Sequence, residues 1–161
     1  MKIVDVYNRG KPVISLEIFP PRSDYPVETI FETLDHLKTL NPGYISVTYG
    51  AGGSNRARTV EIAARIKRDY GIESLAHLTC VRHTRAEVND ILDELIKEDI
   101  HNILALRGDL PENEPDFDLS RQDYRFAYEL INDVQKKAHF GVAAAAYPAG
   151  HPECSRLKDD L

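Results

Sequence analysis

The 161-residue sequence contains no long run of apolar side chains and no block of basic ones. A membrane-spanning helix needs about eighteen consecutive apolar residues, and a secretory signal needs a shorter apolar run near the start, so the sequence predicts neither. Nucleic-acid-binding proteins usually carry clustered Lys and Arg, whereas this chain has a formal net charge of −6. We therefore expect a cytoplasmic protein that binds neither membranes nor nucleic acid.

Cysteine is scarce, since Cys80 and Cys154 are the two in the chain. Two are too few for the disulfide framework of a small secreted domain, so we expect free thiols. His77, Cys80 and His83 are spaced three residues apart, which resembles the spacing of zinc ligands. On a strand, however, His77 and Cys80 would point to opposite faces, and no second cluster completes four ligands. We expect no metal site.

Segments of two kinds alternate along the chain. Runs rich in apolar residues predict strands, and a segment with apolar residues at helical spacing follows each run. The units repeat at intervals of roughly thirty residues, the pattern of a parallel sheet with crossover helices. The predicted strands are 13–19, 44–48, 74–79, 103–106 and 141–147, and the predicted helices are 27–40, 54–70, 84–96, 124–134 and 154–161.

Two α/β architectures fit five such units. A doubly wound sheet would be complete, whereas a (β/α)8 TIM-type barrel of about 250 residues would be present only through its fifth unit. Polar residues at the carboxyl ends of all five predicted strands favour the barrel, because a barrel gathers those ends at one mouth. We therefore expect residues 1–161 to form a single, partial TIM-barrel domain. The polar residues are Glu17, Thr48, Tyr49, His77, Thr79, Arg107, Asp109, Tyr147 and His151.

The segment 103–106 consists of four apolar residues and predicts a strand buried on both faces. It runs directly into Arg107-Gly108-Asp109, whose charges have no role in a core strand. Ligands of parallel α/β folds bind at the carboxyl ends of strands, so these residues are candidates for a binding site. Two solvated charges on a loop would give the same sequence, and both interpretations stay open on this stretch alone.

Glu17 lies inside the apolar run 13–19. On an edge strand its side chain would face water, whereas burial would keep the carboxyl group protonated and suit it to act as a general acid. The glycine-rich segment 50–53 precedes a predicted helix, as phosphate-binding turns do. It lacks the spacing of the dinucleotide-binding fingerprint and the Lys-Ser/Thr of a P-loop, so we interpret it as a flexible turn.

Five short motifs, each at the end of a predicted strand, together resemble the 5,10-methylenetetrahydrofolate reductase family. They are LEIFPPR at 16–22, SVTYGA at 46–51, AHLTC at 76–80, LALRGDLP at 104–111 and AYPAGHPE at 146–153. The motifs follow one another in the order of the family and span nearly the whole chain. The resemblance implies a flavoprotein built on a (β/α)8 barrel, with FAD lying across the barrel mouth.

The resemblance also implies a reaction in folate one-carbon metabolism that supplies methionine synthesis. NADH or NADPH would reduce FAD, and methylenetetrahydrofolate would then receive the hydride and become methyltetrahydrofolate. Glu17 would protonate the bridging ring of the folate, and Asp109 would lie by the pyrimidine edge of the flavin and favour hydride donation. Tyr49 would contact the nicotinamide cofactor. FAD contacts would fall at Thr48, Ala51, His77, Arg107, Gly108, Asp109, Ala127, Tyr147, His151 and Asp160.

The family pattern continues through further strands that residues 1–161 do not contain. The later positions that grip the folate's pterin and tail, and the rest of the adenosine contacts, lie among them. A half barrel would expose two unpaired strand edges, so we expect homo-oligomers formed through those edges or dependence on a missing part. A non-catalytic half-barrel fragment and a five-stranded doubly wound binding domain remain the alternatives to a reductase.

Overall fold

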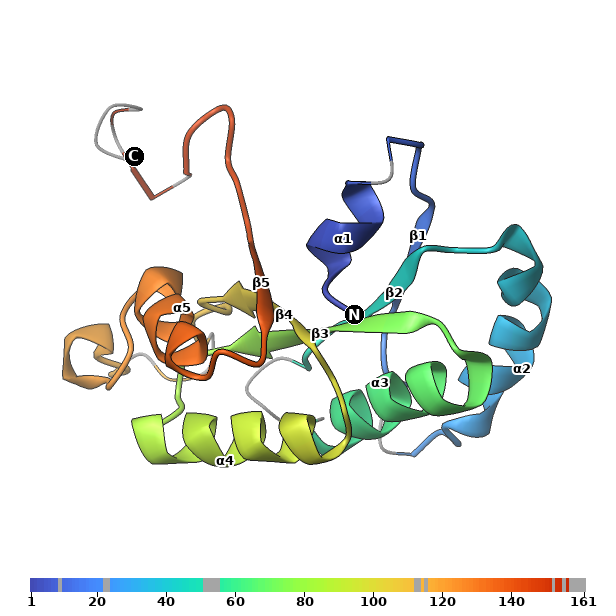
Figure 1. Ribbon diagram of the computed structural model, residues 1–161. Helices are drawn as coiled ribbons and strands as arrows, with labels where there is room; N and C mark the ends of the chain where they lie inside the picture. Colours follow the sequence, from blue (N-terminus) through green and yellow to red (C-terminus); the bar gives the residue numbers. More distant parts are fainter. Residues whose placement is uncertain are drawn as a thin grey trace.

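The computed structural model describes residues 1–8, 10–21, 24–50, 56–111, 114, 116–151, 153–154 and 156. Five strands and four α-helices alternate in it after a short initial α-helix (Figure 1). The strands are β1 (Ser15–Ile18), β2 (Tyr44–Val47), β3 (Glu73–Thr79), β4 (Asn102–Leu106) and β5 (Gly141–Ala144). The helices are α1 (Ile3–Tyr7), α2 (Glu28–Leu37), α3 (Arg56–Tyr70), α4 (Arg85–Lys97) and α5 (Ala127–Lys136), with 3-10 turns η1 (Lys38–Leu40) and η3 (Leu119–Arg121).

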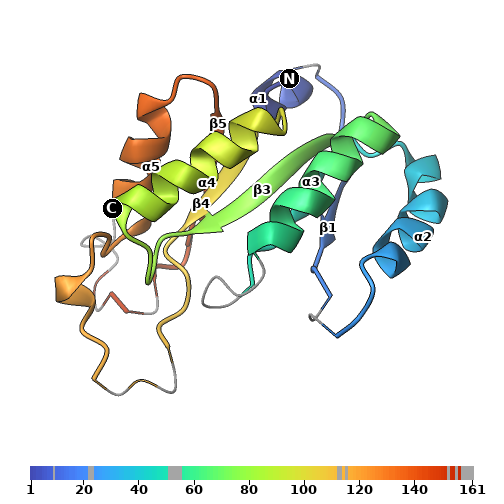
Figure 2. The same cartoon turned by 90° about the horizontal axis from the view of Figure 1, so that it is seen from below.

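The strands form one sheet in the order β1-β2-β3-β4-β5, and each neighbouring pair is parallel. A doubly wound sheet reverses its strand order at a switch point. Because this order has no reversal, the doubly wound alternative is wrong. Helices α2, α3, α4 and α5 lie in one layer on the same side of the sheet (Figure 2). The predicted parallel α/β fold is confirmed, and closure of the sheet into an eight-stranded barrel stays a prediction.

The predicted elements match the observed ones closely, with differences at the ends of the chain. Helix α1 was not predicted, because its five residues are too few to show a helical period. The predicted helix 84–96 begins with a capping box, in which Thr84 accepts from the backbone of Glu87 and Glu87 accepts from that of Thr84. The predicted helix 154–161 falls mostly outside the described residues.

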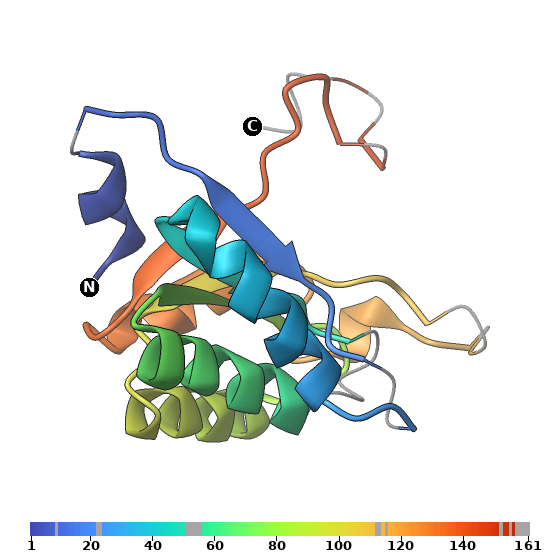
Figure 3. The same ribbon diagram turned by 90° about the vertical axis from the view of Figure 1, so that its right-hand side faces the viewer.

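The two faces of the sheet differ in character. The face toward α2–α5 carries the hydrophobic core, whereas α1 is the one described helix on the other side (Figure 3). The prediction that residues 103–106 are buried on both faces is wrong, because Leu104 and Leu106 point away from the helices and are only partly buried. The strand residues that build the core are Ile45, Val47, Ala76, Leu78, Ile103 and Ala105.

Asn102 ties α1 to the amino-terminal ends of the central strands. Its side-chain oxygen accepts from the backbone N–H of Ile3 at 2.8 Å. Its amide nitrogen donates to the carbonyls of Met1 at 3.0 Å and Ser74 at 3.4 Å. The residue is 1% exposed. A buried amide that makes three hydrogen bonds holds helix and strands in a fixed relation.

Two histidine rings stack at the same end of the sheet, with the centroids of His101 and His139 4.4 Å apart. Nε2 of His101 lies 2.9 Å from Oδ1 of Asp99, whose other oxygen is 2.8 Å from Nζ of Lys67. Burial lowers the pKa of His101. Lys67, the amino terminus and His139 lower it further, while Asp99 opposes the shift.

Replacing Asn102 by Leu is expected to lower the free energy of unfolding by about 2–4 kcal/mol. The N–H of Ile3 and two carbonyls would lose their partner at a site that a leucine cannot satisfy. Urea unfolding followed by circular dichroism measures the change. Asn132→Ala, on the exposed side of α5, is the matched control and should change the free energy by less than about 0.5 kcal/mol. An equal effect of the two substitutions would contradict the role of Asn102.

The lowered pKa of His101 predicts a loss of stability in mild acid. A histidine whose folded pKa lies below the unfolded value of about 6.5 binds fewer protons when folded than when unfolded. Its contribution to stability is therefore fully present above about pH 6.5 and is lost as the pH falls through the lower folded value. We expect His101→Gln to reduce the slope of unfolding free energy against pH below that point. His36→Gln, exposed on α2, is the control, and equal slopes in all three proteins would refute the prediction.

Candidate active site

Three neighbouring strands bring Glu17, Ser46 and His77 together on the face of the sheet that points away from α2–α5 (the uncovered face). The hydroxyl of Ser46 donates to Oε2 of Glu17 at 3.1 Å, and Nε2 of His77 lies 3.5 Å from the same oxygen. The strand register explains the contacts, because Glu17 is level with Ser46 and Ser46 is level with Leu75, two residues before His77. A carboxyl, a hydroxyl and an imidazole around one oxygen are able to hold and transfer a proton.

Burial is distributed differently from the sequence expectation. The side chain of Glu17 is 49% exposed, whereas that of His77 is 9% exposed. Glu17 lies on β1, at one edge of the sheet. Of the two interpretations of Glu17, the edge-strand one is confirmed and the buried one is wrong. It is His77 that is desolvated, and burial lowers its pKa while the charge of Glu17 partly opposes that shift.

The turn after β4 places Arg107 and Asp109 at the carboxyl edge of the sheet. Gly108 has a φ of +88°, and a Cβ there would lie 2.9 Å from side-chain atoms of both Thr79 and Val81. A larger residue would clash with the end of β3 as well as strain the backbone. The carbonyl of Arg107 accepts from the N–H of Val81 at 2.8 Å, which fixes the turn against the segment after β3. Asp109 is exposed.

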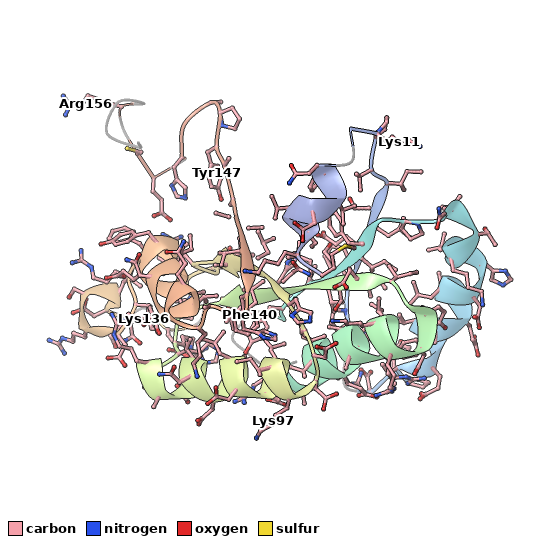
Figure 4. All side chains as sticks on the ribbon, viewed as in Figure 1. Lys11, Lys97, Lys136, Phe140, Tyr147 and Arg156 are labelled. Carbon is pink, nitrogen blue, oxygen red and sulfur yellow. The ribbon has the colours of Figure 1, made fainter. Side chains whose placement is uncertain are left out.

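The segment after β5 folds back toward this turn. Arg107 donates two hydrogen bonds to Glu153, at 2.6 and 2.8 Å. The N–H of Glu153 in turn donates to Nδ1 of His151 at 3.1 Å, and the ring of His151 packs edge-on against Tyr147, 4.7 Å between centroids. The ion pair raises the pKa of Arg107 and lowers that of Glu153. Tyr147 lies on the continuation of β5 away from the helix layer, opposite Lys97 of α4 (Figure 4).

Tyr49 lies apart from these groups. Its ring packs against the core cluster, and its hydroxyl is 3.3 Å from Nε2 of His83. Burial raises the pKa of Tyr49 to about 12, with smaller effects from Arg56 of α3 and Glu94 of α4. These neighbours belong to the helix-covered side of the sheet. The expectation that the polar residues of all five strand ends share one cavity is therefore wrong for Tyr49.

The structure thus gathers the predicted site residues into two groups at the carboxyl edge. One is Glu17 with His77, and the other is Arg107 with Asp109, Tyr147 and His151. In the described ranges no hydrogen bond or ion pair joins the two. Thr48 follows β2 and its N–H donates to Ile18, while Ala127 is the first residue of α5. Ala51 and Asp160 lie outside the described residues.

Sequence reasoning missed two residues of these groups, Ser46 and Glu153. Both stand inside the quoted motifs, yet neither has a pattern that marks it. Ser46 is recognisable once the register of β1 and β2 is known, because it is then level with Glu17. Glu153 is recognisable only from its contact with Arg107, which lies 46 residues away in the chain.

The described part of the chain has neither a metal-binding cluster nor a membrane-spanning helix. No group of three or more His, Cys, Asp or Glu side chains there is arranged to hold a metal ion. None of the described helices combines the length and apolar character of a membrane span.

The chain is similar in sequence to members of one known protein family. A family model described as methylenetetrahydrofolate reductase matches residues 2–161. The chain is 37% identical over 153 residues to 5,10-methylenetetrahydrofolate reductase of Escherichia coli. The aligned region covers 95% of this chain and 50% of that protein.

Two other relatives are similarly close. The reductase of Pectobacterium carotovorum is 36% identical over 95% of this chain and 49% of its own length. Methylenetetrahydrofolate reductase (NADH) 1 of Arabidopsis thaliana is 35% identical over 95% of this chain and 27% of its own length. The chain therefore spans about half the length of the bacterial relatives and about a quarter of the plant one. The match along residues 2–161 shows that the chain belongs to the methylenetetrahydrofolate reductase family.

Proposed function

We propose that residues 1–161 contribute the first five β/α units of a flavin-dependent catalytic barrel. The barrel reduces 5,10-methylenetetrahydrofolate to 5-methyltetrahydrofolate with NADH or NADPH, through FAD. One observation carries the proposal: the motifs shared with the family end at one edge of a parallel sheet whose crossover helices α2–α5 lie on one side. That arrangement is the one by which barrels build their active sites.

The residues at the carboxyl edge fit a flavin nucleotide. The guanidinium of Arg107 suits a diphosphate, because it forms paired charge-assisted hydrogen bonds, as it does here with Glu153. Gly108 leaves space where a side chain would clash, and Tyr147 offers a half-exposed ring. Bound FAD supplies the hydride chemistry that no side chain provides. The residues proposed to hold it are Thr48, Ala51, His77, Arg107, Gly108, Asp109, Ala127, Tyr147, His151 and Asp160.

Two carboxyl groups have separate roles in the proposal. Glu17 delivers a proton to the bridging ring of the folate, and its half-exposed position leaves it accessible to a substrate. Asp109 keeps a negative charge at the edge of the site, where it disfavours an anionic reduced flavin and stabilises a cationic substrate. Tyr49 is left out of the proposed nicotinamide contact, since its ring packs toward α3 and α4.

The outer edges of β1 and β5 have no neighbouring strand among the described residues. Exposed strand edges pair readily with other chains. We infer that they pair with the rest of a barrel or with a second copy of the chain in a cytoplasmic homo-oligomer. These edges also favour the second candidate, a non-catalytic half barrel, which would be a flavin-free protein.

The first test is flavin binding. The purified chain is expected to take up FAD and show the flavin absorbance band, and Arg107→Ala should weaken binding roughly tenfold or more by removing a charge-assisted contact. Arg121→Ala, whose side chain is 83% exposed on η3, is the matched control. Fluorescence titration of FAD measures both. Protein that stays colourless in excess FAD would favour the non-catalytic half barrel.

The second test separates the two half-reactions. In the complete enzyme, Glu17→Gln is expected to keep reduction of the flavin by the nicotinamide and to lose folate reduction by about a hundredfold or more. The physical reason is that only the folate step needs a proton from this group. Anaerobic stopped-flow absorbance follows each half-reaction. The control is Glu32→Gln, which changes an exposed residue of α2. Equal losses in both half-reactions would show that Glu17 is not the acid.

A further inference from the structure

His77 has a buried nitrogen without a hydrogen-bond partner in the described part of the chain. Its side chain is 9% exposed, and Nε2 makes no hydrogen bond with any described residue. Leaving a buried polar atom in this state costs free energy, so the groups around Nε2 indicate its role. The charged group it faces is Glu17, whose Oε2 lies 3.5 Å away. The β4 residue level with it is Leu104, which cannot form a hydrogen bond through its side chain.

Two arrangements satisfy this nitrogen. A protonated Glu17 can donate its O–H to Nε2, or an Nε2–H can donate to the ionised carboxylate. In both cases one proton lies between Oε2 and Nε2. Two interacting groups that share a proton titrate as a pair rather than separately.

Ser46 fixes the geometry of this contact. Its hydroxyl lies 3.1 Å from Oε2 of Glu17 and 3.4 Å from the carbonyl of Leu16, and Ser46 itself is 6% exposed. Both close contacts of the Glu17 carboxyl therefore involve Oε2. The carboxyl is oriented by β2 and β3, while about half of its side chain remains open to the uncovered face.

We propose that Glu17 and His77 form one proton-holding pair and that Ser46 orients it. His77 is then a positioning residue for the acid as well as a candidate flavin contact. The inference rests on the proposed function for its role in folate reduction. In that step the proton leaves the Glu17 carboxyl for a folate ring nitrogen, the adjacent C–N bond breaks, and its electron pair stays on that nitrogen. The Glu17–His77 pair has then lost one proton, which it regains from water.

The test is a pH titration of the folded full-length chain, labelled with 15N-histidine, without flavin or folate. NMR follows the ring nitrogens of His77, identified by their loss in His77→Gln. Because the Glu17 charge opposes the lowering of the His77 pKa by burial, Glu17→Gln should lower the His77 midpoint by at least about 0.5 pH units. Ser46→Ala should give a smaller shift in the same direction, since Glu17 would no longer be held against Nε2.

Two matched controls remove the same chemical groups at other positions. Ser15→Ala deletes an exposed hydroxyl from β1, and Glu32→Gln neutralises an exposed carboxylate on α2. Neither should move the His77 midpoint. An unchanged midpoint in Glu17→Gln would overturn the pairing. The titration needs no reductase activity, so its failure is distinct from a failure to bind FAD, which would count against the proposed function instead.

Discussion

Connections between parallel strands pack back on a twisted sheet with one hand only. In this chain each connection also moves one position in the same direction, so α2, α3, α4 and α5 all reach the same side of the sheet. The apolar residues that point toward those helices form the core. Polar residues can then occupy the opposite face without disturbing it, and every strand ends at the same edge. The position of the candidate site follows from this winding.

Two buried polar side chains on the uncovered face show how differently such groups can be used. Asn102, at the amino-terminal end, makes three hydrogen bonds and joins α1 to the sheet. His77, nearer the carboxyl end of β3, leaves Nε2 without a partner in the described structure. The first arrangement stabilises the fold, whereas the second leaves a group available for chemistry.

Local sequence patterns predicted the order of strands and helices because apolar periodicity and capping residues act within one element, as Thr84 and Glu87 do in α4. They did not predict the partial exposure of Leu104 and left the exposure of Glu17 open, because both depend on what lies beyond the strand in space. Ser46 was missed for a related reason. Its value lies in the register with a strand about thirty residues earlier in the chain, which periodicity does not report.

The consecutive strand order also bears on how the chain acquires its structure. Each strand pairs with the one that precedes it, so the pairing of Ser15 with Tyr44 or Tyr44 with Glu73 closes a loop of a single helical unit. Pairing with the preceding strand keeps the entropic cost of loop closure lower than pairing with a more distant strand would. The polypeptide is thus able to assemble stepwise from its amino terminus during synthesis, each new unit docking on a template already made.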